Sequence, residues 1–429
     1  MICSLEGWII IAMNNYKPVW RNPRLWSLGI GQTLIWAAIF YVFPAMLLKW
    51  SDHFGWSIAE VSLAFTLALV SSALAGIAAG RIIDKGHARI LFTLSVCAGA
   101  ILISTIPYVT NIFTFYFIWI LIGIAMAGCL YEPCFSYITR TYKDNSKNAI
   151  VFITLQAGFA SSVSYSVSTI LSNAIGWDNT LHLFSLTLIF VTAPLFWYGS
   201  PEPNRQVPDE ETSESTRSTQ SPKVTPFLET VIPIIRNPVF WLIFMTFAAF
   251  AATQGMFVSQ TFPLLQSKGM NDNTSVILAS LIGPMQVLAR FILFLADHLV
   301  NKNIPAAKIA TLCLLAFAGT SVLLLFGNGK LLIVLIFVSI QGGMYGLVSI
   351  VRPVLTSESL GTKNFGVIFS LTSMGFVWGY AFAPGIAGWI AEIWNYDAVL
   401  VTMIFVSIVG MISLGFSKRF QKMDVKSEK

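Results

Sequence analysis

The sequence predicts an all-α membrane protein whose twelve transmembrane helices form two six-helix bundles related by a parallel repeat. Of its 429 residues, 55% are hydrophobic and 11% are charged, whereas soluble proteins average about 25% charged residues. Twelve apolar segments are each long enough to cross a bilayer, which takes roughly 20 helical residues. Landmarks of the first half also recur in the second half at nearly constant spacing. Together these observations exclude a soluble domain.

The first six predicted spans precede the longest polar stretch between spans, residues 200–236. This stretch holds several prolines and the acidic run Asp209-Glu210-Glu211. It cannot bury a core, so we expect a flexible linker. The six spans before it are Trp26–Leu48, Val61–Ala79, Ile90–Val109, Ile112–Phe135, Ala149–Leu171 and Leu181–Tyr198.

Six further predicted spans follow the linker. They are Pro238–Phe262, Ser275–Ala296, Ala306–Phe326, Leu331–Ile350, Phe365–Ile390 and Val399–Phe416. The predicted organisation is a cytoplasmic N-terminus (1–25), an N-terminal bundle (26–199), a cytoplasmic linker (200–236), a C-terminal bundle (237–417) and a disordered cytoplasmic tail (418–429). Met1 and Met13 are both candidate starts of translation.

The charges of the loops predict the orientation of the chain. Connections that follow odd-numbered spans carry only Lys49, Lys268 and Lys330 as basic residues. The other connections and both ends carry nearly all the rest, for example Arg21, Arg24, Lys85, Arg89, Arg140, Lys143, Lys147, Lys302, Lys308, Lys363, Lys418 and Arg419. Basic loops stay in the cytoplasm, so we expect both termini there and the protein in the cytoplasmic (inner) membrane. The net charge of +6 then reflects topology, and we expect no nucleic-acid partner.

Four landmarks relate the two halves at offsets of 213 to 220 residues. The pairs are Asn22-Pro23 with Asn237-Pro238, Phe43-Pro44 with Phe262-Pro263, Asp84 with Asp297, and Glu132-Pro133 with Arg352-Pro353. Each half has six spans, so the two copies have the same membrane orientation. Such parallel repeats place a substrate between the halves, near the middle of the bilayer.

A short charged loop separates the second span from the third. It contains Gly80, Asp84, Lys85, Gly86 and Arg89. The spacing Gly-x-x-x-Asp-Lys-Gly-x-x-Arg resembles the corresponding cytoplasmic loop of the major facilitator superfamily, although the second glycine lies one position closer to the aspartate than is usual. With the span count, linker and repeat, the resemblance covers about the whole chain. It implies transport by alternating access, with the loop and Asp297 controlling the change of conformation.

Shorter stretches resemble bacterial facilitators akin to monocarboxylate and oxalate/formate-type carriers. They are Phe54-Gly55-Trp56-Ser57, Gly128-Cys129-Leu130-Tyr131-Glu132-Pro133, and Gly283-Pro284-Met285-Gln286-Val287 with Arg290. The resemblance implies that Arg290, in the eighth span, binds a substrate carboxylate. A guanidinium suits that task because it can donate two parallel hydrogen bonds. The alternative is an ion pair, or a side chain that reaches the cytoplasmic interface.

Two other charged residues lie late in the predicted spans, Glu132 in the fourth and Arg352 at the cytoplasmic end of the tenth. Such residues are functional candidates because burying a charge in hydrocarbon is costly. One hypothesis is a salt bridge between the bundles that closes the cytoplasmic mouth. Another is pairing within each half, of Glu132 with Arg89 or Arg140 and of Arg352 with Glu358 or Asp297. Direct substrate contact is a third, and Glu132 is also the one acidic candidate for proton coupling inside a span.

Neutral side chains of the first and seventh spans are further candidates for substrate binding. They are Gln32, Trp36, Tyr41, Gln254 and Gln260. The resemblance implies that these two spans line the cavity, where uncharged polar groups orient a solute. The alternative for each residue is a role in helix packing.

The predicted function is secondary active transport of a small solute, an organic anion such as a carboxylate, with protons as a candidate co-substrate. The sequence lacks the phosphate-binding loop of ATP-driven pumps and any pattern of catalytic or metal-binding residues. We therefore expect no enzyme activity and no cofactor. The expected partners are the lipid bilayer and the small-molecule substrate, with the protein a monomer. The alternatives are an exporter of a drug or of a secreted metabolite such as a siderophore, and a transporter-like solute sensor.

Overall fold

The computed structural model describes residues 21–142, 146–201, 227–300, 305–327, 329–361 and 365–427. The regular structure of these residues is helical, and it includes twelve candidate membrane spans. Each of the twelve predicted spans overlaps one of them. The prediction of an all-α membrane fold is confirmed.

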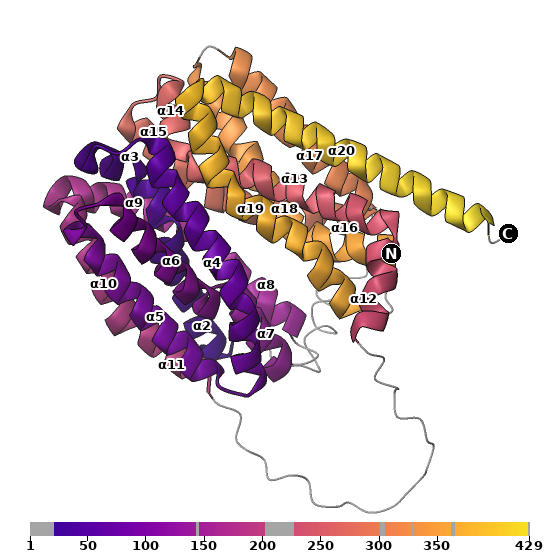
Figure 1. Ribbon diagram of the computed structural model, residues 1–429, viewed down its shortest axis with the longest axis horizontal. Helices are drawn as coiled ribbons and strands as arrows, with labels where there is room; N and C mark the ends of the chain where they lie inside the picture. The colour runs from indigo at the N-terminus through magenta and orange to yellow at the C-terminus, as the bar shows by residue number, and fades with distance from the viewer. Residues whose placement is uncertain are drawn as a thin grey trace, which may run out of the picture.

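The first bundle runs from indigo to magenta in Figure 1. Several of its spans consist of two or three consecutive helical pieces. The elements are α2 (Pro23–Ile35), the π-helix η2 (Trp36–Phe40), α3 (Val42–Phe54), α4 (Ile58–Asp84), α5 (Ala88–Thr105), the 3-10 helix η3 (Ile106–Tyr108), α6 (Ile112–Cys129), α7 (Tyr131–Tyr142), α8 (Ser146–Ala157), α9 (Ala160–Ile175), α10 (Trp177–Thr187), the π-helix η5 (Leu188–Thr192) and α11 (Ala193–Gly199).

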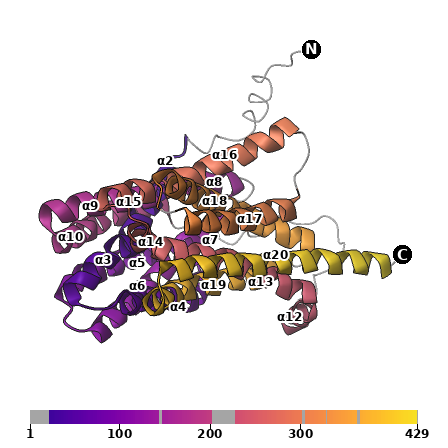
Figure 2. The same ribbon diagram turned by 90° about the horizontal axis from the view of Figure 1, so that it is seen from above.

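The second bundle lies beside the first and runs from salmon to yellow in Figure 1. Its last helix is the longest, and Figure 2 shows this helix extending past the other helices toward the C-terminus. The elements are α12 (Phe227–Arg236), α13 (Pro238–Ser259), α14 (Thr261–Ser267), α15 (Asp272–Ser280), α16 (Ile282–Val300), α17 (Ala306–Phe326), α18 (Leu331–Leu360), α19 (Phe365–Ile393) and α20 (Tyr396–Ser427).

The repeated Asn-Pro pair begins a helix in each bundle. The side chain of Asn22 accepts a hydrogen bond from the backbone N–H of Arg24 at 3.0 Å, and that of Asn237 accepts one from Val239 at 2.9 Å. Asparagine is a favoured N-cap, and proline suits the first helical position because its missing N–H would have no intrahelical partner there. The sequence repeat therefore corresponds to the same structural feature in both halves.

The charged turn between the second and third spans is shorter than predicted. Helix α4 continues through Gly80 to Asp84, and the turn is confined to residues 85–87, where Gly86 has φ of +88°. A positive φ favours glycine because it has no Cβ. The helix end is supported from α7, since Nη1 of Arg140 donates a hydrogen bond to the Ile83 carbonyl at 3.0 Å. Basic side chains are favourable partners for the free carbonyls of a helix end.

Two stretches predicted to be irregular are helical where the structure describes them. The last ten residues of the predicted linker form α12, in which Val231 is buried. Helix α20 continues through the predicted tail to Ser427, and Gln421 Nε2 donates a hydrogen bond to the Ser359 carbonyl at 3.1 Å. Neither Gly nor Pro occurs between Lys418 and Ser427 to end the helix. The remainder of the linker, residues 202–226, lies outside the described residues.

The contacts between the bundles include a row of hydrogen bonds at the end of the molecule opposite the linker. There α4 packs along α19, and these helices are the most extensively joined pair from opposite bundles. Ser57 Oγ donates to Glu392 Oε2 at 2.8 Å, and the Gly385 N–H donates to Thr66 Oγ1 at 2.8 Å. On the other side of the seam, Ser162 Oγ of α9 donates to the Ser280 carbonyl of α15 at 2.5 Å.

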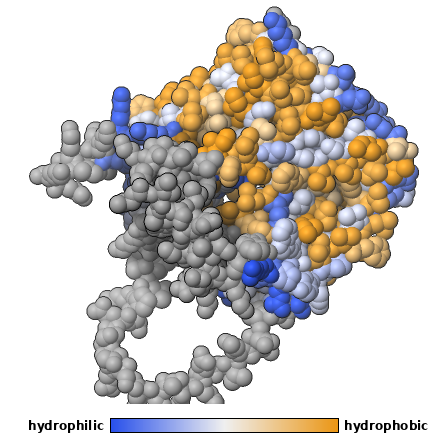
Figure 3. Space-filling model, turned by 180° about the vertical axis from the view of Figure 1, so that it is seen from behind, coloured by the Kyte–Doolittle hydropathy of each residue, from blue (hydrophilic) through white to orange (hydrophobic). Residues whose placement is uncertain are grey.

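The outer surface suits a lipid environment. In Figure 3 a broad hydrophobic area covers the visible face, and hydrophilic residues gather mainly toward its edges. Large apolar side chains stay exposed along the spans, for example Leu94, Phe113 and Phe190, which is 71% exposed. In water such a surface would be an aggregation liability. This distribution supports a multi-pass membrane protein.

Candidate functional site

Arg290 lies on α16 and joins the two bundles. Its Nε donates a hydrogen bond to the Gly346 carbonyl of α18 at 3.0 Å, and its Nη1 donates a longer one to the Thr154 carbonyl of α8 at 3.4 Å. The residue is half-buried, and no ion pair connects it to another described residue. A guanidinium with two backbone carbonyls as partners keeps its full positive charge uncompensated. That arrangement favours an anion nearby.

Two pairs of aromatic rings lie near Arg290, one pair from each bundle. Trp36 and Tyr131 of the first bundle have ring centroids 4.7 Å apart. Tyr345 and Phe376 of the second are nearly parallel, with centroids 6.5 Å apart. Arg290 donates to the carbonyl of Gly346, the residue after Tyr345. The two pairs are linked through Phe40 and Tyr380, whose rings lie 6.0 Å apart, with Phe40 4.7 Å from Trp36 and Tyr380 6.4 Å from Phe376. All four rings are half-buried. The structure therefore brings Trp36 and Arg290, both predicted site residues, into one neighbourhood.

A widened helical turn positions Trp36. The first span changes from α-helix to π-helix over Trp36–Phe40 and resumes as α3 shortly before Pro44. Single π-turns inside α-helices are frequent at functional sites. Just beyond it, the Tyr41 ring lies 5.9 Å from that of Tyr165, and the Phe40 ring lies 6.0 Å from Tyr380 of the other bundle. Tyr41, a predicted site residue, thus belongs to a continuous group of rings.

Gln32 supports a break in the fourth span. Its Nε2 donates a hydrogen bond to the Cys129 carbonyl at 2.9 Å, and its Oε1 is buried without a partner. The Cys129 carbonyl would normally accept from the residue four positions later, which is Pro133 and has no N–H. The span breaks there, between α6 and α7. The contact that the structure describes for Gln32 is therefore with the backbone of a neighbouring helix.

The two predicted glutamines of the seventh span have different surroundings. Gln254 is completely buried, and neither atom of its amide has a hydrogen-bond partner. Gln260 is also fully buried, but its Nε2 donates to Ser62 Oγ at 2.8 Å and its Oε1 accepts from the Tyr396 hydroxyl at 3.3 Å. Gln260 therefore belongs to the inter-bundle contacts opposite the linker. Gln254 retains its full hydrogen-bonding capacity.

Arg352 is held by aromatic faces. Its guanidinium carbon lies 3.9 Å from the centroid of Phe376 and 5.7 Å from that of Phe247, and its Nε is buried without a partner. Glu132 is exposed, within electrostatic reach of Arg352 but not in an ion pair with it. Guanidinium groups are attracted to ring faces. Arg352 thus has no compensating carboxylate within ion-pair distance among the described residues.

The pairs predicted within each half do not form among the described side chains. Arg89 lies over the Trp197 ring at 4.7 Å, and Glu358 Oε1 accepts from the Ala306 N–H at 3.4 Å. The ion pair that the structure does describe joins Lys268 to Asp397, at the end opposite the linker. Lys85 is exposed in its turn. The side chains of Asp84 and Asp297 lie outside the described part of the chain, so the role predicted for them stays a prediction.

Several rings of this neighbourhood were not predicted from the sequence. They are Tyr131, Tyr165, Tyr345, Phe376 and Tyr380. Aromatic residues are common throughout the spans, at 14% of the chain, so composition does not distinguish them. What distinguishes these rings is that they lie opposite charged or polar candidates on neighbouring spans. Recognising this from sequence would require knowing which face of each helix points inward.

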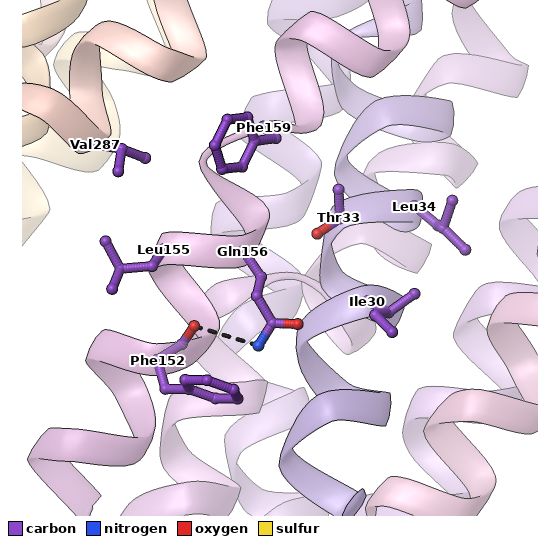
Figure 4. A pocket seen from close by; sticks show the side chains of 8 residues that line it. All are labelled: Ile30, Thr33, Leu34, Phe152, Leu155, Gln156, Phe159 and Val287. Atoms are coloured by element: carbon purple, nitrogen blue, oxygen red, sulfur yellow. Dashed lines mark hydrogen bonds between the residues drawn. The ribbon is translucent and has the colours of Figure 1, made fainter. Parts of the chain in front are cut away.

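A separate groove of about 500 Å³ follows α2 and α8 and reaches α16. Figure 4 shows Gln156 pointing between Phe152 and Ile30, with Val287 on the far side of Leu155 and Phe159. The Gln156 amide packs closely against Gly29, where a Cβ would meet its Nε2 at 2.4 Å. The lining is apolar apart from Thr33 and Gln156 and contains no charged residue. It does not suit a small anion.

Comparisons with known proteins agree with this architecture. The sequence profile described as Major Facilitator Superfamily matches residues 28–329. A bacterial homologue of the human lysosomal transporter Spinster, solved in an inward-facing and unoccupied conformation, is 16% identical with a TM-score of 0.67, over 94% of this chain and 97% of that one. No curated protein matches the sequence.

Two further solved transporters have similar folds. A mutant of the nucleoside transporter NupG is 12% identical with a TM-score of 0.69, over 92% of this chain and 98% of that one. A mutant of the peptide transporter POT, in complex with alafosfalin, is 15% identical with a TM-score of 0.66, over 92% of this chain and 94% of that one. At such low identity these likenesses concern the fold, and the narrower likeness to monocarboxylate carriers stays a prediction. The superfamily profile spans well over half of the chain, which therefore belongs to the Major Facilitator Superfamily and is a membrane transporter rather than an enzyme.

Proposed function

We propose that this protein is a secondary active transporter of a small organic anion, such as a carboxylate, working by alternating access. The observation that carries the proposal is the uncompensated positive charge between the bundles. Arg290 and Arg352 have carbonyls and ring faces as partners, and neither forms an ion pair among the described residues. Buried guanidinium groups in membrane spans are costly without a counter-charge. A substrate anion supplies it.

Arg290 is the proposed carboxylate ligand. Its contact with the Thr154 carbonyl of the first bundle is long, at 3.4 Å, whereas its contact with Gly346 of its own bundle is 3.0 Å. A bound carboxylate replaces the weaker contact with a charge-assisted pair, which is about twice as strong as a neutral hydrogen bond. Substrate binding then changes a link between the bundles. The bound anion thereby affects the relative position of the two bundles.

The proposed orientation places the protein in the cytoplasmic (inner) membrane, with the linker and both termini on the cytoplasmic side. The row of hydrogen bonds from Ser57–Glu392 to Thr66–Gly385 then closes the outer end, and the structure is the inward-facing state. Glu132 and Arg352 form the proposed cytoplasmic gate, apart here and paired when the bundles close. Asp84, Asp297 and the basic residues of the turn stabilise one of the two states.

The experiment that tests the function measures uptake of radiolabelled organic acids into proteoliposomes containing the purified protein. We expect Arg290→Gln to reduce the rate at least tenfold. Arg290→Lys should reduce it nearly as much, because an ammonium cannot make the bidentate contact. Lys330→Gln, which removes a positive charge outside the spans, is the matched control and should transport normally. Native rates in Arg290→Lys would contradict the proposed contact.

The same vesicles separate the alternatives. Saturable binding without flux would indicate a solute sensor. Efflux of neutral or cationic compounds, with no movement of organic acids, would indicate an exporter of another substrate class. Proton coupling through Glu132 predicts that an inward proton gradient accelerates uptake and that Glu132→Gln abolishes the acceleration. An unchanged response in Glu132→Gln would assign coupling elsewhere or exclude it.

A further inference from the structure

The rings around Arg290 differ from the rings that stabilise the helix packing. Trp50 and Trp119 are fully buried in the first bundle. Trp36, Tyr131, Tyr345 and Phe376 remain half-buried although all four lie within spans. The two pairs meet across the seam through Phe40 and Tyr380, whose rings lie 6.0 Å apart: Phe40 is 4.7 Å from Trp36, and Tyr380 is 6.4 Å from Phe376. Aromatic surface in this location is available to a ligand that enters between the bundles.

Several buried polar atoms of the spans lack partners. The indole Nε1 of Trp36 and the hydroxyl of Tyr165 are buried with no hydrogen bond, and both amide atoms of the fully buried Gln254 are unpaired. Buried polar groups in folded proteins are nearly always paired. An indole N–H can only donate. The packed rings Trp50 and Trp119 also have unpaired indole N–H groups, but Trp36 differs from them in being half-buried, so its N–H can donate to an acceptor of a ligand that enters between the bundles.

The geometry points to an aromatic carboxylate as the transported anion, with its carboxylate at Arg290 and its ring between Trp36–Tyr131 and Tyr345–Phe376. This inference rests on the proposed function and narrows its substrate class. Aromatic rings prefer offset-stacked or edge-to-face neighbours at centroid separations of 4.5 to 7 Å. A substrate ring that lies between the two pairs can have one such neighbour from each bundle, on opposite sides. An aliphatic acid of the same size gains burial but not these ring contacts.

Contacts from both bundles also explain how a ring assists transport. Trp36 and Tyr131 belong to the first bundle, and Tyr345 and Phe376 belong to the second. A planar group between them is held by both bundles at once, as the carboxylate is by Arg290, which reaches Thr154 across the seam. A ligand that contacts both bundles binds best when they are close together, and so it favours the occluded arrangement. The aromatic ring and the carboxylate of the substrate therefore both favour the occluded arrangement.

The test compares two acids that differ in aromaticity and share charge and ring size. Binding of benzoate and of cyclohexanecarboxylate to the purified full-length protein is measured by titration calorimetry. We expect about tenfold tighter binding of benzoate, since two aromatic contacts of ordinary strength correspond to that ratio. In Trp36→Leu and Tyr345→Leu the ratio should fall toward one. Phe117→Leu, at a ring that is 60% exposed on the outside of α6, is the control and should keep the ratio.

The ratio of two affinities does not depend on how much of a variant is folded, so partial misfolding cannot imitate the result. Equal affinities in the unaltered protein, or a ratio that survives in both variants, would overturn the aromatic preference. If both acids bind equally and Arg290→Gln abolishes both, the proposed anion transport stands and the narrower inference fails. If neither acid binds and no organic acid is transported, the proposed function fails and this inference fails with it.

Discussion

Gln32 shows how a polar residue inside a span satisfies the backbone of another span. Pro133 removes the N–H that the Cys129 carbonyl would accept from, and Gln32 Nε2 provides the replacement at 2.9 Å. The repeat places Pro353 at the equivalent position of the tenth span, yet α18 continues from Leu331 to Leu360. The fourth span breaks into α6 and α7 instead. Gln32 therefore stabilises a feature that one bundle has and the other lacks.

The Gln32 contact can be tested by rescue. Gln32→Leu should lower stability by about 1–3 kcal/mol, because it leaves a buried carbonyl without a partner. Pro133→Ala restores an N–H within reach of that carbonyl, so the double variant should recover most of the loss. Apparent melting temperatures in one detergent provide the measurement. A double variant that melts as low as Gln32→Leu alone would show that the carbonyl is not what Gln32 stabilises.

At the scale of residues, the sequence predicted where charged side chains lie in the spans more reliably than it predicted their partners. Arg290 and Trp36 come into one neighbourhood, and Arg352 lies within a span, as expected. The partner of Arg352 is an aromatic face and not a carboxylate. Charge spacing along one helix cannot reveal this, because the rings belong to other helices: Phe247 of α13 precedes Arg352 by 105 residues, and Phe376 of α19 follows it by 24. The direction in which each helix faces decides such contacts.

At the scale of elements, the contact between α4 and α19 depends on small residues. A Cβ on Gly388 would lie 2.9 Å from the Ser62 Cβ and 3.0 Å from the Ala59 Cα. A Cβ on Gly385 would meet Thr66 Oγ1 at 2.9 Å. Small residues let helix backbones approach closely in membranes. Here they permit the hydrogen bonds that join the bundles opposite the linker.

Widening this contact should therefore shift the conformational equilibrium. Gly388→Val introduces a side chain where none fits, at a cost of roughly 1–3 kcal/mol to the close packing. We expect the bundles to separate at this end. Pulsed electron paramagnetic resonance between spin labels at positions 52 and 271, on a cysteine-free background, would detect a longer distance. Gly415→Val is the control, because nothing lies within 4 Å of a Cβ there. An unchanged distance distribution in Gly388→Val would contradict the role of this contact.

The number and positions of the spans were predictable, whereas their internal breaks were not. Length and apolar composition decide whether a helix spans a membrane, so all twelve predicted segments overlap observed spans. The break of the fifth span, at 158–159, and that of the eighth, at 281, occur where the bundles meet, and Gly283 packs against the Gly158 carbonyl. That contact joins residues 125 positions apart. Local sequence does not encode it, although glycine at both positions permits it.

At the scale of the whole molecule, the two bundles are held together unevenly. Hydrogen bonds from Ser57, Ser62 and Thr66 cross to the second bundle at the end opposite the linker. Toward the linker, Glu132 is exposed and Arg352 has no carboxylate partner at ion-pair distance. A transporter that alternates must exchange one set of contacts for another of similar free energy. In the proposed gate, Glu132 and Arg352 supply the second set, because they have opposite charge and occupy equivalent positions of the two halves.

Exchanging these two charges tests the gate directly. Glu132→Arg alone, or Arg352→Glu alone, places two like charges at the mouth and should reduce transport at least tenfold by preventing its closure. The double variant restores an attractive pair in reversed order, so it should regain a substantial part of the rate. Uptake in proteoliposomes, at equal amounts of protein, is the measurement. Because Arg352 also lies on Phe376, the double variant loses this ring contact. Binding of the substrate is therefore measured alongside transport to separate the two effects. If the double variant recovers substrate binding but not transport, the two residues belong to the binding site and not to a gate. If it recovers neither, the pairing of Glu132 with Arg352 is excluded.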